Sequence, residues 1–196
     1  MGRGDRIDFP LGLFNARGIA SLAVVGVLLG ASIEAHRLDE YLQAARVDLD
    51  STRVEVRLAL TPGVDVADAI VREIDVDRDG VLSQREQAAY VTRVLEAVHL
   101  DVDGHTARLH PTSSRFPAAA DLKGGEGTIT IRADAGIPPL RPGTHRVYVR
   151  NAYHAEIGAY LSNALVPRTK QIAVTAQQRN ANQSELSIDY VVGAAR

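Results

Sequence analysis

The order of apolar and polar residues changes period along this chain, and each period predicts a different kind of element. Apolar and charged residues alternate over residues 44–60, which is the period of half-buried strands. Asp50-Ser51-Thr52 interrupts the alternation with residues typical of turns, so this stretch predicts a β-hairpin. Thr61-Pro62-Gly63 follows and is expected to end the second strand.

Residues 65–99 have a helical period on both sides of a short acidic loop. The first predicted helix has Asp65 as its expected N-cap. Its apolar stripe is formed by Val66, Ile70 and Ile74. A second helix is expected over residues 84–99. Its apolar face is formed by Ala88, Val91, Val94, Leu95 and Val98. This helix-loop-helix is predicted to be an insertion in the surrounding β-structure.

Alternation returns in the second half of the chain. Asp103-Gly104 predicts a tight hairpin between strands at residues 100–102 and 106–110. Residues 111–127 contain prolines, serines and paired glycines, and are expected to form an exposed loop. Further strands are expected at residues 128–132, 146–150, 160–166, 171–176 and 185–192. Seven or eight short strands with turns between them predict a mainly β fold with inserted α-structure, an immunoglobulin-like β-sandwich.

Residues 1–35 differ from the rest of the chain and predict a cleaved secretory signal peptide. Arginines precede an apolar run over residues 18–31, which is too short to cross a bilayer core of about 30 Å. Cleavage is expected after Ala35 or, alternatively, after Ala31, and an uncleaved N-terminal anchor is the competing interpretation. The mature chain, residues 36–196, is then expected to be one periplasmic or secreted domain without membrane insertion.

Composition argues against several classes of protein. The net charge of −2 argues against nucleic-acid binding, because phosphate recognition requires a basic surplus. The absence of cysteine excludes disulfide frameworks, thiolate metal sites and cysteine nucleophiles. No nucleophile elbow, HExxH motif or glycine-rich phosphate loop occurs, so no enzymatic activity is expected. We interpret the polar run Asn151-Ala152-Tyr153-His154 as a strand-end turn, with a pocket as the alternative interpretation.

The acidic loop, residues 75–86, has the pattern that calcium binding requires. Calcium prefers six to eight oxygen ligands, which a twelve-residue loop supplies at alternate positions. Asp75, Asp77 and Asp79 occupy loop positions 1, 3 and 5. Glu86 at position 12 can supply two carboxylate oxygens. Because like charges this close repel one another unless a cation is bound, the loop predicts one Ca²⁺ ion.

The remaining loop residues match the same pattern, D-x-[DN]-x-[DN]-G-x5-E. Gly80 at position 6 allows the sharp bend, and Val81 at position 7 is expected to contribute its backbone carbonyl. Ser83 at position 9 can hold a bridging water. Leu82 is the apolar residue expected to pair as a short strand with a neighbouring loop. The competing interpretation is a capping box formed by Ser83 and Glu86, which would begin a helix without any metal.

EF-hand loops normally occur in pairs, and the sequence contains no second loop. The single site is therefore expected to rest on another strand of this protein, on a protein partner, or on a second copy of the chain in a homodimer. A lone hand in an exported protein is expected to bind calcium with a Kd of about 10⁻⁴–10⁻³ M. The ion would then act as a structural brace or as the signal for a calcium sensor.

The chain around this loop resembles a group of exported bacterial EF-hand proteins. The segments that carry the resemblance are residues 35–43, 60–64, 151–154 and 163–167. The same region is similar to the extracytoplasmic part of hydrogenase/urease-accessory membrane transporters, which handle nickel or cobalt. The resemblance spans nearly all of residues 35–192. It concerns the extracytoplasmic region of those transporters and not their membrane domain. It implies a calcium-binding periplasmic domain and does not imply transport.

A second metal hypothesis concerns His36. Cleavage after Ala35 would leave His36 as the first residue, whose α-amine and imidazole can bind copper or nickel. Such a site needs another imidazole nearby. The other histidines are spread along the chain without ligand spacing: His99, His105, His110, His145 and His154. A periplasmic protein that handles a transition metal is therefore the alternative function.

Overall fold

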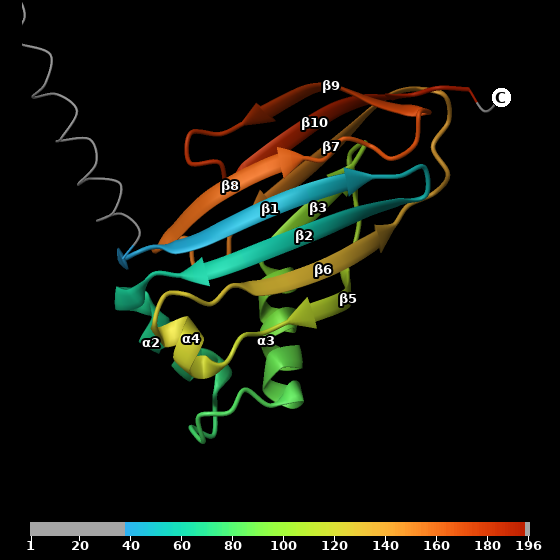
Figure 1. Ribbon diagram of the computed structural model, residues 1–196. Helices are drawn as coiled ribbons and strands as arrows, with labels where there is room; N and C mark the ends of the chain where they lie inside the picture. Colours follow the sequence, from blue (N-terminus) through green and yellow to red (C-terminus); the bar gives the residue numbers. More distant parts are fainter. Residues whose placement is uncertain (1–37, 195–196) are drawn as a thin grey trace, which may run out of the picture. The chain divides into compact units, whose positions relative to one another are not determined.

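The computed structural model describes residues 38–194, which form a mainly β structure with two five-stranded sheets (Figure 1). The first sheet contains, in spatial order, β5 (His110–Arg115), β6 (Ile129–Gly136), β2 (Arg53–Pro62), β1 (Tyr41–Leu49) and β8 (Gly158–Ala164). The second contains β4 (His105–Thr106), β3 (Val98–Val102), β7 (Gly143–Asn151), β10 (Glu185–Val192) and β9 (Ile172–Arg179). The expectation of a mainly β fold is confirmed.

One hydrophobic core joins the two sheets. Neighbouring strands are antiparallel except β1 and β8, which run parallel. Alternate residues of β1 and β10 are buried, as the period of the sequence predicts. Val47 of β1 and Ile188 of β10 belong to different sheets and to the same buried cluster, and both are 0% exposed. The inward faces of both sheets therefore contribute to a single core.

The helices gather at one end of the sheets, as Figure 1 shows. They are α2 (Val64–Ile74), α3 (Gln84–Glu96) and α4 (Ala119–Lys123). The predicted stripe of the first helix is confirmed at Ile70 and Ile74, which are buried. Val66 is only partly buried, and the stripe is completed by Ala67 and Val71.

The ends of both long helices differ from the predictions. Gly63, not Asp65, is the N-cap of α2, because the Gly63 carbonyl accepts the Ala67 N–H at 2.9 Å. Asp65 lies instead in the first turn, where a negative charge is favourable at the positive end of the helix. At the other end, α3 stops at Glu96 and Val98 already belongs to β3. The chain leaves the helix because it begins to pair with β7.

The hairpin at Asp103-Gly104 is confirmed, with φ values of 53° and 83° that match a two-residue turn. The strand after this turn is shorter than expected, because β4 ends at Thr106. The prediction of a loop over residues 111–127 was wrong, since β5 and α4 both lie largely within it. Every residue of β5 is exposed at the edge of its sheet, so no alternation of apolar residues marks it in the sequence.

The later strands occur where they were expected, although their ends differ. β10 occupies the predicted range, whereas β6 and β7 are longer than predicted. The described residues contain ten strands rather than seven or eight. The strand that was not predicted is the exposed β5, and β4 is the shortest of those that were.

The predicted signal peptide, its two cleavage positions and His36 lie outside the described residues, so these expectations stay predictions. Within residues 38–194, none of the helices combines the length and the apolar composition needed to cross a membrane.

The hairpin tip supports an ion pair whose contribution to stability depends on pH. The Asp103 carboxylate contacts His145 Nδ1 at 2.7 Å and accepts the Arg146 N–H at 2.8 Å. The hydrogen bond with Asp103 raises the pKa of His145, against the opposing effect of burial. Burial acts to raise the pKa of Asp103, but the hydrogen bonds from His145 and Arg146 outweigh it and lower that pKa.

We therefore expect the parent to be more stable than an Asp103→Asn variant by about 0.5 kcal/mol near pH 5.5, where both charges are present. The raised pKa of His145 means that this advantage declines as pH rises above about 6.5, through the pKa of the folded state. The lowered pKa of Asp103 means that it also declines when pH falls through the pKa of the folded carboxyl group. Urea denaturation at pH 5.5 and 8 measures the difference, and an advantage that is equal at both pH values would contradict the assignment.

Candidate metal centre

The acidic loop connects α2 to α3 and lies at the far end of this helix pair, away from the sheets (Figure 1). Asp75 is the C-cap of α2, and its N–H donates to the Val71 carbonyl at 2.8 Å. Ser83 is the N-cap of α3. The helices therefore fix the first and last residues of the loop, while the residues between them form its bend.

Three of the predicted ligand side chains come together. Asp75, Asp77 and Glu86 place one carboxylate oxygen each so that all three atoms lie within 4.8 Å of one another. Among residues 38–194, this is the only group of three or more potential His, Asp or Glu ligands with that spacing. Asp79 is not part of it, and its Oδ1 accepts the Val81 N–H at 2.7 Å.

Asp75 organises the loop from within. Its side chain is buried, with 7% exposed, and its two oxygens accept the N–H groups of Asp79 and Gly80 at 3.1 and 3.0 Å. Gly80 has a φ of 82° and provides the predicted bend. A Cβ there would meet no atom within 4 Å, so the left-handed backbone rather than space favours glycine.

Glu86 closes the loop with the hydrogen bonds of a capping box. Its Oε2 accepts the Ser83 N–H at 3.0 Å and the Ser83 hydroxyl at 2.7 Å. The Glu86 N–H donates back to Ser83 Oγ, so the capping box that the sequence offered as an alternative is present. Its Oε1 accepts the Val76 N–H at 2.7 Å from the other end of the loop. The same carboxylate thus begins α3 and belongs to the acidic group.

The pKa values of two loop carboxyl groups differ from their usual values in opposite directions. The Asp79 N–H bond acts to lower the pKa of Asp77, but desolvation and the neighbouring negative charges outweigh it and raise that pKa. The Ser83 hydroxyl, followed by the Ser83 and Val76 N–H groups, lowers the pKa of Glu86. Hydrogen bonds therefore favour the charged form of Glu86, whereas desolvation and the repulsion between carboxylates disfavour the charged form of Asp77. A divalent cation would relieve this repulsion.

The three other predicted contributors have different outcomes. Val81 is 64% exposed, and the role of its carbonyl as a ligand stays a prediction, as does a water held by Ser83. Leu82 does not belong to a strand within residues 38–194, and its pairing with a second copy of the chain stays a prediction. Its side chain is buried in the core cluster, and its carbonyl accepts Gln87 Nε2 at 2.7 Å. Gln87 belongs to α3, so this hydrogen bond links the loop to the helix that follows it.

A polar cluster beside the loop was missed in the sequence. The Glu73 carboxylate, two residues before Asp75, accepts hydrogen bonds from Arg93, Tyr153 and His154. Residues 153–157 form the turn between β7 and β8, so the strand-end interpretation of this polar run is confirmed. Tyr153 and Glu73 are 80 residues apart in the chain, so no local pattern of the sequence predicts their contact.

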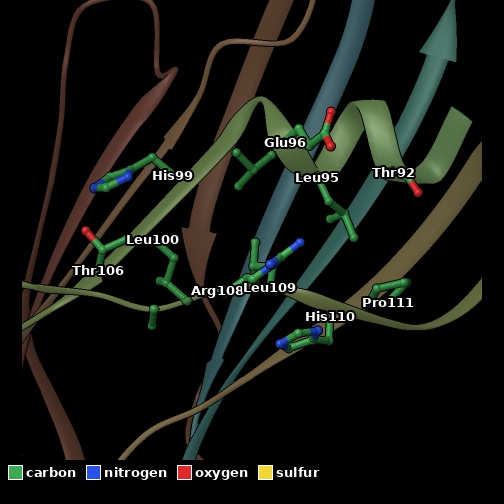
Figure 2. Close-up of a pocket in the computed structure, with 12 residues that line it drawn as sticks. Thr92, Leu95, Glu96, His99, Leu100, Thr106, Arg108, Leu109, His110 and Pro111 are labelled. Carbon is green, nitrogen blue, oxygen red and sulfur yellow. The ribbon is translucent and has the colours of Figure 1, made fainter. Parts of the chain in front are cut away.

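The histidines considered as partners of His36 lie within the described residues, whereas His36 itself does not. Within residues 38–194, none of them belongs to a group of three potential ligands: His99, His105, His110, His145 and His154. A hollow of about 440 Å³ lies between α3, β3 and the chain before β5, and Figure 2 shows residues that line it. Leu95, Leu100 and Leu109 are among its apolar lining residues, and Glu96 and His110 are among its ionisable ones.

Comparisons of the chain with protein-family models, with curated proteins and with solved structures find no match in any of the three. The resemblance to exported EF-hand proteins therefore stays a prediction from the sequence.

Proposed function

We propose that this chain is an exported, non-catalytic calcium-binding protein whose residues 75–86 form one EF-hand. In this proposal, the two sheets are an immunoglobulin-like β-sandwich, and α2, the loop and α3 are the EF-hand helix-loop-helix inserted into it. The bound ion joins the end of one helix to the beginning of the next.

The observation that carries the proposal is the convergence of Asp75, Asp77 and Glu86. These side chains occupy the first, third and last positions of a twelve-residue loop, and their carboxylate oxygens lie within 4.8 Å of one another. Carboxylates are hard oxygen donors, which suit calcium better than copper or nickel. The Val81 carbonyl and water would supply further oxygens, since three carboxylates alone do not complete six to eight ligands.

The test is thermal and chemical denaturation of the purified protein over a range of calcium concentrations. Binding to the folded state alone is expected to add about 2.7 kcal/mol to the free energy of unfolding at 100 times the Kd. A double variant, Asp77→Asn with Glu86→Gln, should lose this response. The glutamine can keep the capping box, so the loss would report on the ligands rather than on the helix end.

A matched control removes one aspartate charge and one glutamate charge outside the loop. Asp65→Asn with Glu96→Gln changes one exposed acid on each of the same two helices. This control is expected to keep the full calcium response, with one site by calorimetry. A folded parent without a calcium response, or a control that loses it, would refute the proposal.

A further inference from the structure

Glu73 makes contacts that reach beyond its own helix. Its Oε1 accepts the Tyr153 hydroxyl at 2.7 Å and Arg93 Nε at 3.2 Å. Its Oε2 contacts His154 Nε2 at 2.7 Å. The Glu73 side chain is 28% exposed, so these contacts are partly shielded from water. Hydrogen bonds to a charged acceptor in such a setting are stronger than those between neutral groups.

Arg93 ties α2 to α3 at two points. Besides contacting the Glu73 carboxylate, Arg93 donates a hydrogen bond from Nη2 to the Glu73 backbone carbonyl at 2.9 Å. That carbonyl lies in the last turn of α2, two residues before Asp75. Arg93 is seven residues after Glu86 on α3, a distance of about 10 Å along the helix. The pair therefore joins the helix that ends at the first loop ligand to the helix that carries the last.

The turn between β7 and β8 is itself attached to both sheets. The Tyr153 N–H donates to Asn151 Oδ1 at 3.0 Å. The Tyr153 carbonyl accepts Gln43 Nε2 at 2.7 Å and the Tyr160 hydroxyl at 2.9 Å. Gln43, Asn151 and Tyr160 lie on β1, β7 and β8. Tyr153 and His154 therefore hold the Glu73 carboxylate against strands of the two sheets.

EF-hands that act as sensors expose a groove when calcium changes the angle between their helices, whereas those that act as buffers barely open. Rotation of α2 away from α3 in this protein would separate Glu73 from Arg93 and leave a partly buried carboxylate with fewer partners. A polar group that loses its partner in such a setting costs more than an exposed one.

We propose that Glu73 and Arg93 are positioning residues that hold α2 and α3 in one arrangement with and without calcium. This inference rests on the proposed function. It decides whether the calcium ion acts as a structural brace or as the signal for a sensor. Calcium braces the loop of this protein, and the helix pair does not open as a sensor would. Residues that support metal ligands without binding the metal keep those ligands oriented. Their removal weakens metal binding about 10–100-fold in other sites.

The distance between the helices can be measured directly because the chain has no cysteine. Ala69 on α2 and Ala88 on α3 are exposed, so both can be changed to cysteine and spin-labelled. In the parent, the distance is expected to change by less than about 2 Å when calcium is added. In Glu73→Ala, the distance distribution without calcium should broaden, and calcium should narrow it again.

Calorimetric calcium titrations of the same proteins complete the test. Glu73→Ala is expected to bind calcium at least about tenfold more weakly than the parent. Glu73→Gln, which keeps an acceptor oxygen, should recover part of that loss. Glu96→Ala is the control, since this exposed glutamate at the end of α3 has no contact with the cluster and should leave the affinity unchanged. If Glu73→Ala does not fold, Arg93→Lys provides the same comparison from the other helix.

The outcomes separate this inference from the calcium proposal itself. A parent that binds no calcium refutes both. A parent that binds calcium and moves its helices apart overturns the fixed arrangement alone. Parent-like affinity in a folded Glu73→Ala or Arg93→Lys variant would show that these residues do not position the ligands.

Discussion

Replacing Ile74 with alanine is expected to lower the free energy of unfolding by about 2–5 kcal/mol. Ile74 is the last residue of α2, its side chain is 0% exposed, and it belongs to the cluster that joins the helices to the sheets. Its truncation removes apolar contacts and leaves a cavity that neighbouring side chains fill only in part. The midpoint of urea denaturation, measured in excess chelator, should fall while the m-value stays unchanged.

The matched control for this prediction lies two residues further along the chain. Val76 is 70% exposed, so Val76→Ala should change stability by no more than about 0.5 kcal/mol. Ile74 immediately precedes the acidic loop and Val76 is its second residue, so both substitutions remove aliphatic carbon at the same end of the loop and differ chiefly in burial. Similar losses in the two variants would contradict the assignment of Ile74 to the core.

The second large effect is expected at Gln43, where a leucine should cost about 2–4 kcal/mol. Gln43 is 0% exposed on β1. Its Nε2 donates to the Tyr153 carbonyl at 2.7 Å, and its Oε1 accepts Asn151 Nδ2 at 2.8 Å. Leucine would fill similar space without either bond. The Tyr153 carbonyl would keep the Tyr160 hydroxyl as a donor, but the Asn151 amide would be left buried without its acceptor.

Chemical denaturation of single and double variants measures this effect. Gln178→Leu on the exposed part of β9 is the control and is expected to change stability by less than about 0.5 kcal/mol. Gln43→Leu combined with Asn151→Leu should cost less than the sum of the two single changes, because the second change removes the unpaired amide. Strictly additive costs would show that the two side chains do not interact.

The parts of this protein that depend on neighbouring residues could be predicted from the sequence. The convergence of Asp75, Asp77 and Glu86 occurs within twelve consecutive residues between two amphipathic helices, so the pattern of the loop defines it. The hairpin at Asp103-Gly104 is equally local, because its turn depends on two residues with positive φ.

The parts that depend on distant residues could not be predicted in this way. β5 has no apolar alternation because it is an exposed edge strand, and its place is set by pairing with β6. Leu82 was expected to pair with another loop, but its side chain packs in the core and its carbonyl contacts Gln87. No pattern within the loop predicts the hydrogen bond from Gln87.

The sequence by itself determined the mainly β composition, the helix-loop-helix insertion and the acidic residues of the loop, because periodicity and ligand spacing are properties of short segments. Only the tertiary structure decided that Asp79 stays outside the group of converging carboxylates and how the helix pair is held. Glu73 contacts Tyr153 across 80 residues and Arg93 across 20 residues of chain. Contacts over such separations follow from how sheets and helices pack together, which no local pattern of residues specifies.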